Sequence, residues 1–133
     1  MSLGGNNMNG EQYLMTKPRI AVIGVTENQD KYGFKIFKRL LDLDYEVYGI
    51  SPIYKELLGQ TLYPSLLEIN NEIDLVIFVV SPKYGKDYLN QVITKKIRNV
   101  WFQPGTFDDS FSTIIKENNI QYFRDCVLLC TPC

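Results

Sequence analysis

Three cysteines stand near the end of the sequence, at positions 126, 130 and 133, and the chain of 133 residues contains no histidine. Thiolates can act as nucleophiles or bind metals, but a tetrahedral zinc site needs a fourth ligand that no histidine can supply here. The lack of histidine also excludes Ser–His and Cys–His nucleophile pairs and every histidine general base. We therefore expect no metal, and a chain that binds a ligand without being an enzyme.

The segment from Gly24 to Gly33 is a candidate anion site. It follows an apolar run and leads into a predicted helix, whose free backbone N–H groups and dipole favour a negative charge. Lys31 adds a positive charge beside that helix start. The middle glycine of G-x-G-x-x-G is absent, and no acidic residue follows the second apolar run, so the pattern is not typical of NAD(P) sites. A simple tight turn at Gly24 is the alternative interpretation.

A Ser-Pro pair occurs twice, at Ser51-Pro52 and Ser81-Pro82, each time directly after an apolar run. Proline stops strand pairing and offers an apolar surface. Two such surfaces at one sheet edge could hold an adenine ring between them. Termination of the two strands is the simpler explanation for either pair alone.

The elements that position these residues alternate along the chain. Apolar runs predict strands over residues 20–23, 45–50, 73–80, 100–103 and 120–123, and amphipathic stretches predict helices over 34–43, 66–69, 84–96 and 109–118. This order predicts a single α/β domain, Rossmann-like and doubly wound, with a mainly parallel sheet of about five strands. Ligands of such sheets bind outside the carboxyl ends of the strands. We expect residues 1–17 to be poorly structured and residues 18–133 to form the domain.

Composition excludes several classes of protein. Fourteen Lys and Arg residues against fifteen Asp and Glu residues leave a net charge of -1, which argues against nucleic-acid binding. No segment has the roughly 20 apolar residues of a membrane span, so we expect no membrane partner. The first residues lack a secretory signal, so we expect a cytoplasmic protein with free thiols.

The order and spacing of these motifs resemble the small stand-alone CoA-binding proteins, which are similar to the N-terminal CoA-binding domain of succinyl-CoA ligase α subunits. The segments that carry the resemblance are Ile20 to Gly24, Tyr32-Gly33, Ser51-Pro52, Leu58-Gly59, Tyr63 to Leu66, Ser81-Pro82, Val100 to Gly105, and Cys126. The family typically has Gly-Ala-Ser in its first loop and Asn-Pro after its second strand. This chain has Gly24-Val25-Thr26 and Ser51-Pro52 at those places.

The resemblance implies that CoA or an acyl-CoA binds at the strand ends without being converted. The implied phosphate cradle consists of Gly24, Val25, Thr26, Lys31, Tyr32 and Gly33. The implied adenosine side consists of Ser51 and Pro52, with Lys55 for the 3′-phosphate; Ser81 and Pro82 form the opposite wall; and Gln103, Pro104 and Gly105 border the pantetheine exit. Cys126 is a candidate for a mixed disulfide with the CoA thiol, and a buried, inert cysteine is the alternative.

Two other functions remain open from the sequence. The chain could be an NAD(P)- or other nucleotide-binding redox or regulatory protein, or a protein-interaction module that has lost its ligand. The acyl group, a partner enzyme and self-association are left undetermined by the residues.

Overall fold

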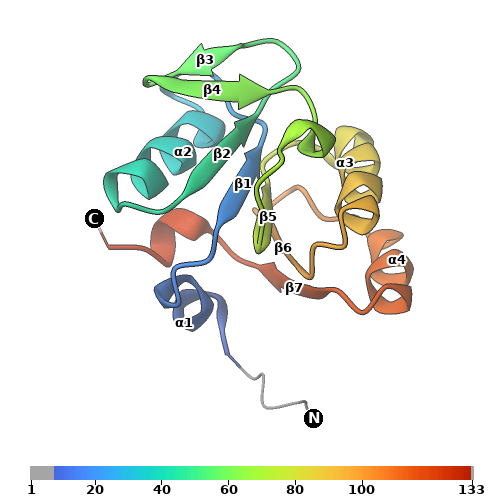
Figure 1. The fold of residues 1–133 in the computed structure, drawn as a ribbon. Helices are drawn as coiled ribbons and strands as arrows, with labels where there is room; N and C mark the ends of the chain where they lie inside the picture. Colours follow the sequence, from blue (N-terminus) through green and yellow to red (C-terminus); the bar gives the residue numbers. More distant parts are fainter. Residues whose placement is uncertain (1–7, 133) are drawn as a thin grey trace.

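A computed structural model describes residues 8–132, which form one sheet with helices on both faces (Figure 1). The strand order is β3-β4-β2-β1-β5-β6-β7, and all neighbours are parallel except β3 and β4. The strands are β1 (Ile20–Ile23), β2 (Val47–Ile50), β3 (Glu56–Leu57), β4 (Gln60–Tyr63), β5 (Leu75–Phe78), β6 (Asn99–Phe102) and β7 (Gln121–Arg124). The predicted doubly wound α/β fold is confirmed.

The sheet has seven strands rather than about five, because a short hairpin is added beyond β2. Strands β3 and β4 are joined by Leu58 and Gly59, which both have positive φ, 53° and 77°. Two positive φ values suit the two-residue hairpin turn, but leucine rarely adopts this conformation. The pattern of Leu58-Gly59 therefore gave no clear hairpin cue.

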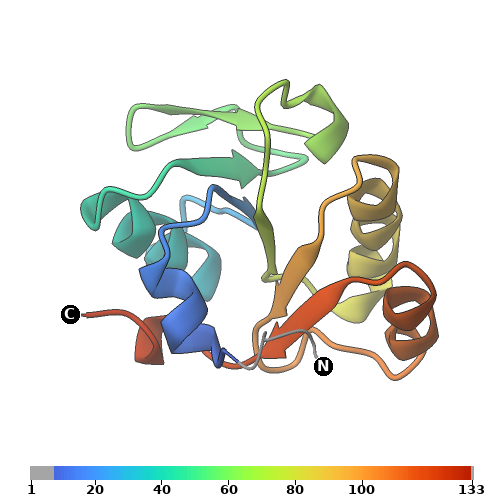
Figure 2. The same cartoon turned by 60° about the horizontal axis from the view of Figure 1, so that its bottom comes forward.

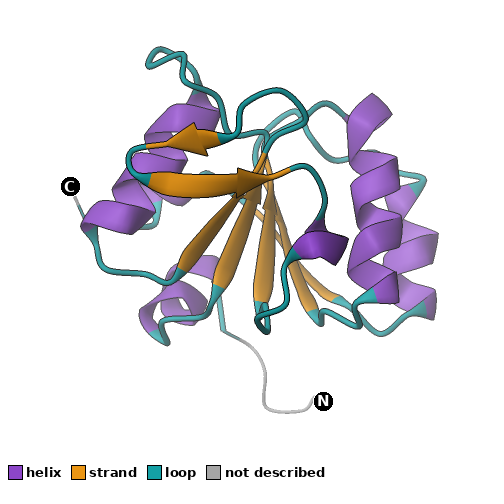
Figure 3. Cartoon of the chain, turned by 45° about the horizontal axis from the view of Figure 1, so that its top comes forward, coloured by secondary structure: helices purple, strands orange, loops and turns teal. Residues whose placement is uncertain are grey.

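Helices cover both faces of the sheet (Figures 2 and 3). A cluster of buried hydrophobic side chains lies on each face. Helices α1 (Gly10–Met15), α2 (Tyr32–Asp42) and the 3₁₀ turn η2 (Val127–Leu129) lie on one face. The 3₁₀ turn η1 (Leu66–Glu68) and helices α3 (Pro82–Thr94) and α4 (Phe111–Glu117) lie on the other. Alternate residues of β1 point to opposite faces, so that Ile20 and Val22 pack under α2, while Ala21 and Ile23 face the α3 side. All four are fully buried, which explains why β1 is apolar throughout.

The segment before β1 differs from the expectation that residues 1–17 are poorly structured. Residues 10–15 form α1, which begins with a capping box between Asn9 and Gln12. Leu14 is 1% exposed, and Gly10 lies so close to Trp101 that an added Cβ would stand 2.4 Å from its ring. Helix α1 is thus part of the packed domain; residues 1–7 lie outside the described residues.

The helices lie where the sequence predicts, with their ends shifted by one or two residues; α4 begins two residues after its predicted start and α3 ends two residues before its predicted end. Asp44 follows α2 with a φ of 63°, and its N–H bonds the Leu41 carbonyl while the Tyr45 N–H bonds that of Leu40. These two hydrogen bonds form a Schellman motif, with aspartate at the position that glycine usually occupies. Helices α2 and α3 each begin two residues before the predicted start, because the extended residues Lys31 and Ser81 already precede the first turn.

Candidate functional site

The loop after β1 brings three parts of the backbone very close together. Gly24 has a φ of 99°, and an added Cβ would lie 2.7 Å from the Val79 carbonyl oxygen after β5. At Gly33, an added Cβ would lie 2.0 Å from the carbonyl oxygen of Gly24. Only glycine fits at either place, so the spacing of Gly24 and Gly33 fixes the start of α2 against the carboxyl end of β1.

Helix α2 begins without a side-chain cap, because Lys31 precedes the first turn and offers no acceptor. Within residues 8–132, no protein group accepts a hydrogen bond from the backbone N–H of Tyr32 or Gly33. The loop spends its own polar groups internally, with Thr26 Oγ1 accepting from the Asn28 N–H at 3.2 Å. The first N–H groups of α2 are therefore free to bind an anion.

The loop after β6 is a turn that holds the neighbouring segment in place. The Thr106 N–H donates to the Gln103 carbonyl at 3.1 Å, and Gly105 has a φ of 86°, as a type II turn with proline second and glycine third requires. The Gln103 side chain is buried; its Oε1 accepts from the Val127 N–H at 2.7 Å, and its Nε2 donates to Cys126 Sγ at 3.5 Å. Gln103 thus joins β6 to the segment that follows β7.

These loops enclose a cavity of about 650 Å³ at the carboxyl ends of β1, β5, β6 and β7. The residues predicted for the site that line this cavity are Gly24, Thr26, Lys31, Tyr32, Gly33, Ser81, Gln103, Pro104, Gly105 and Cys126. The lining residues that the sequence did not indicate are Val79, Val80, Thr106, Leu128 and Leu129. Val79 and Val80 follow the end of β5, which ends two residues before the predicted end.

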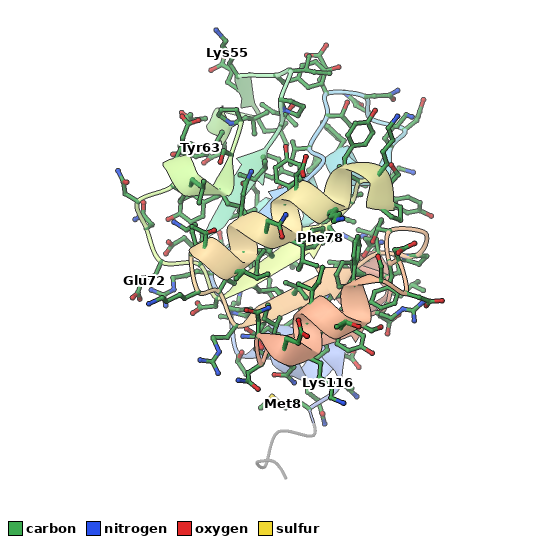
Figure 4. The ribbon with its side chains drawn as sticks, turned by 90° about the vertical axis from the view of Figure 1, so that its right-hand side faces the viewer. Met8, Lys55, Tyr63, Glu72, Phe78 and Lys116 are labelled. Carbon is green, nitrogen blue, oxygen red and sulfur yellow. The ribbon has the colours of Figure 1, made fainter. Side chains whose placement is uncertain are left out.

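Five predicted residues lie outside this cavity. Val25 is 3% exposed and packs in the core beneath α2. Ser51 is also buried, and its Oγ accepts from the N–H groups of Ile53 and Tyr54, so it stabilises the turn after β2. The remaining three are Pro52, Lys55 and Pro82; Pro52 and Lys55 are exposed, and Pro82 is half-buried at the first position of α3. Figure 4 shows Lys55 at the end of the molecule opposite Lys116.

The cysteines differ in their surroundings. Cys126 lies half-buried in the cavity wall, whereas Cys130 packs partly into the core on the α2 side. Burial, with the nearby charge of Asp125, raises the pKa of Cys130 to about 11, so this thiol stays protonated at neutral pH. Cys133 lies outside the described residues. In residues 8–132, no three His, Cys, Asp or Glu side chains gather as a metal site would require.

Comparison with known proteins identifies the family. A model described as the CoA binding domain matches residues 18–132. The chain belongs to this family. The resemblance predicted from the strand-end motifs is therefore confirmed, and membership supports CoA as the ligand. None of the helices in the described part of the chain has the length and apolar character needed to cross a membrane.

The relatives include larger enzymes and small proteins. The α subunit of an ADP-forming acetate–CoA ligase II from Pyrococcus furiosus is 34% identical over 89 residues, which are 66% of this chain and 20% of that subunit. A further ADP-forming acetate–CoA ligase, from Methanocaldococcus jannaschii, is 35% identical over 52% of this chain and 10% of its own length. The chain thus spans a tenth to a fifth of these two ligase chains.

Two small relatives are similar over most of their length. The uncharacterized protein YneT of Bacillus subtilis is 25% identical over 86% of this chain and 85% of its own. The solved structure of a hypothetical protein from Pyrococcus horikoshii OT3 superposes with a TM-score of 0.85 at 30% identity, covering 90% of this chain and 86% of the other. The fold therefore also occurs in proteins of about this size.

Proposed function

We propose that the chain binds CoA or an acyl-CoA in the cavity at the carboxyl ends of its strands and does not convert it chemically. The observation that carries the proposal is the uncapped start of α2, where the free N–H groups of Tyr32 and Gly33 and the charge of Lys31 line the cavity. A pyrophosphate is the part of CoA that such a helix start binds best.

The other walls suit the rest of the ligand. The cavity volume lies within the range of small-molecule sites, about 300–1,000 Å³. Its apolar wall includes Val79, Val80 and Leu128, which can pack against the methyl groups and methylenes of a pantetheine arm. Polar groups for the amides of that arm come from the loop after β6, where Gln103 and Thr106 line the cavity.

Calorimetric titration with CoA, dephospho-CoA, NAD and ATP tests the proposal. We expect CoA to bind about tenfold more tightly than NAD, a difference of about 1.4 kcal/mol. Equal affinity for all four ligands, or none, would contradict CoA binding. Tighter binding of NAD would favour the nucleotide-binding alternative.

The same titration tests the predicted role of Lys55. Dephospho-CoA lacks only the 3′-phosphate, so pairing of Lys55 with this group makes wild-type protein prefer CoA. In Lys55→Ala we expect the preference to disappear, whereas Lys116→Ala, in the last turn of α4, keeps it. An unchanged preference in Lys55→Ala would remove Lys55 from the proposed site.

The absence of conversion is tested separately. The chain has no histidine, so it cannot carry a phosphohistidine intermediate itself. We expect no free CoA from acetyl-CoA, and no ATP from acetyl-CoA with ADP and phosphate, above the rate without protein. Product formation that rises in proportion to the protein concentration, and that persists after further purification, would show that the chain is an enzyme.

A further inference from the structure

Strand β7 is the last strand of the sheet, and one of its sides is open (Figure 1). The N–H groups of Gln121 and Asp125 point toward β6 and donate to carbonyls of that segment. Because backbone groups alternate in direction along a strand, those of Tyr122 and Arg124 point away from β6. Within residues 8–132, no protein group forms a hydrogen bond with these outward N–H and C=O groups.

The side chains of the same two residues form a partly exposed stack with Phe107. The rings of Tyr122 and Phe107 are nearly parallel, at 12°, with their centres 5.7 Å apart. The Arg124 guanidinium lies 4.1 Å from the centre of the Phe107 ring. Tyr122 is 44% exposed, so one large aromatic surface stands beside the outward backbone groups of β7.

The open side of β7 lacks the devices that usually protect an outer strand, such as a proline, a bulge or very short length. Its four residues keep an unbroken register with β6, and Arg124, the one charged residue among them, is held over the Phe107 ring. The outer strand at the other end of the sheet, β3, is only two residues long and begins with an exposed glutamate, Glu56. The sheet can therefore accept a further strand beside β7.

A second copy of β7 is complementary to this side when it runs antiparallel. With the two-fold axis at Phe123, Tyr122 lies opposite Arg124 of the second copy, and each such pair exchanges two backbone hydrogen bonds. A tyrosine ring then faces a guanidinium, which is a favourable cross-strand pair. A slip by two residues would instead place each arginine opposite its own copy, where like charges repel, or each tyrosine opposite its own copy, without a cation.

We propose that the open side of β7 binds the open side of β7 in a second copy of this chain, so that two sheets join across a two-fold axis. The proposal does not rest on CoA binding, because the cavity opens at the carboxyl ends of the strands and the pairing uses the side of the last one. Four strand residues form a small interface, and interfaces below about 1,200 Å² are usually weak. The dimer therefore forms and dissociates with protein concentration.

Sedimentation equilibrium of the full chain, at concentrations from about 1 µM to about 1 mM, tests for the dimer. We expect the mean mass to rise with concentration from that of one chain, 15.4 kDa, toward that of two. The mass of one chain at every concentration would overturn the proposal.

Charge variants test the register. In Tyr122→Lys, the new charge lies opposite Arg124 of the second copy, and we expect the dimer to be about tenfold weaker because the pair occurs twice across the axis. The double variant Tyr122→Lys/Arg124→Glu places opposite charges face to face and should restore the dimer. Tyr84→Lys is the matched control, since Tyr84 is an exposed tyrosine in the first turn of α3; it should dimerise as wild type does.

Urea denaturation checks that each of these variants is folded. A dimer that is unaffected by Tyr122→Lys, or that the double variant does not restore, would overturn the proposed pairing.

Amide hydrogen exchange followed by NMR locates the interface directly. We expect the N–H groups of Tyr122 and Arg124 to exchange at least about tenfold more slowly where the dimer prevails. The N–H of Gly59, in the exposed turn between β3 and β4, should keep its rate. Slow exchange of the β7 groups at every concentration would show that one chain covers them by itself, and fast exchange in the dimer would place the contact elsewhere; either result would overturn the proposal.

Discussion

The two edges of the sheet treat their polar groups in opposite ways. At the amino edge, Arg19 before β1 faces Asp74 before β5, and the carboxylate accepts from the Arg19 N–H, Nε and Nη2 at 2.8, 2.7 and 2.9 Å. The Arg19 carbonyl in turn accepts from the N–H groups of Asp74 and Leu75. At the carboxyl edge, the first N–H groups of α2 have no acceptor among the described residues. A fold that pairs its polar groups at one edge can leave them free for a ligand at the other.

This difference is electrostatic as well as geometric. The side-chain hydrogen bonds from Arg19 hold the pKa of Asp74 below its ordinary value of 3.8. Because the Arg19 and Asp74 charges neutralise each other, they attract a charged ligand only weakly. The charge of Lys31 faces a cavity, and within residues 8–132 no carboxylate forms a salt bridge with it.

Crowding at the carboxyl edge should give the largest effect on stability. In Gly33→Ala, the added Cβ meets the Gly24 carbonyl oxygen, and backbone atoms cannot move aside easily. We expect a loss of about 3 kcal/mol in the free energy of unfolding, measured by urea denaturation. Gly85→Ala in α3 is the matched control, because its nearest atoms would lie 3.6 Å away and alanine favours a helix by about 0.5–1 kcal/mol. Equal effects of the two substitutions would contradict the close approach at Gly33.

The second-largest effect on stability should come from Arg39, which holds the segment after β7 that contributes Leu128 and Leu129 to the cavity lining. Arg39 of α2 donates from one nitrogen, Nη1, to the Leu128 carbonyl at 3.3 Å and to Thr131 Oγ1 at 3.0 Å. Arg39→Ala should lower the free energy of unfolding by about 1.5 kcal/mol, the usual value for hydrogen bonds to a charged group. It should also speed amide hydrogen exchange in the segment that follows Cys126. Lys38→Ala breaks an exposed pair with Asp42 and should cost less than about 0.5 kcal/mol. If Arg39→Ala leaves amide hydrogen exchange in this segment unchanged, the segment keeps its structure without Arg39.

The charge of Lys31 should matter for binding more than for folding. Lys31→Ala should weaken CoA binding by up to about fivefold, because it removes one cation beside the bound anion, and an exposed ion pair is worth up to about 1 kcal/mol. Added salt should reduce the difference in CoA affinity between Lys31→Ala and wild type, because salt screens an exposed charge. Lys116→Ala, at the C-terminal end of α4, serves as the control and should bind as wild type does. Equal weakening in both variants would point to net charge rather than to the start of α2.

The amino edge should show a pH effect on stability and none on binding. Because its pKa is depressed in the folded state, Asp74 contributes stability that is present above pH 3.8 and is lost as the pH falls through the lower folded-state pKa. Asp74→Asn should therefore be less stable than wild type at pH 7, by less than about 1 kcal/mol since the pair is partly exposed. The difference should vanish in strong acid, while CoA affinity at pH 7 stays unchanged. A change in affinity would show that the edges are coupled.

The sequence was informative where topology alone positions residues. Parallel strands end at one edge, so Gly24, Ser81 and Gln103 could be brought together without knowing any side-chain contact. The sequence was less informative where a contact between distant segments determines which residues line the cavity. Leu128 and Leu129 reach the cavity because Arg39 holds the chain after β7 against α2, and no local pattern contains that pairing.

At the end of β2 the sequence instead predicted a site residue, Ser51, that does not line the cavity. Ser51 directly follows an apolar strand, as site residues do in this fold, yet its hydroxyl is used by the turn that leads into the β3–β4 hairpin. The short strands β3 and β4 carry little hydrophobic pattern, so the hairpin and its use of Ser51 were not predicted. Helix α1 was missed for a related reason: it is one and a half turns long, and only Gly10 and Leu14 are buried along it.

Trp101 has a practical consequence. It is the only tryptophan of the chain; its ring lies under Gly10 of α1, and its Nε1 donates to the Asp125 carbonyl at 2.8 Å, one residue before Cys126. An indole's emission responds to the hydrogen bond that its nitrogen makes. The protein therefore carries a built-in optical probe, through which events at the cavity wall can be followed in real time without a label.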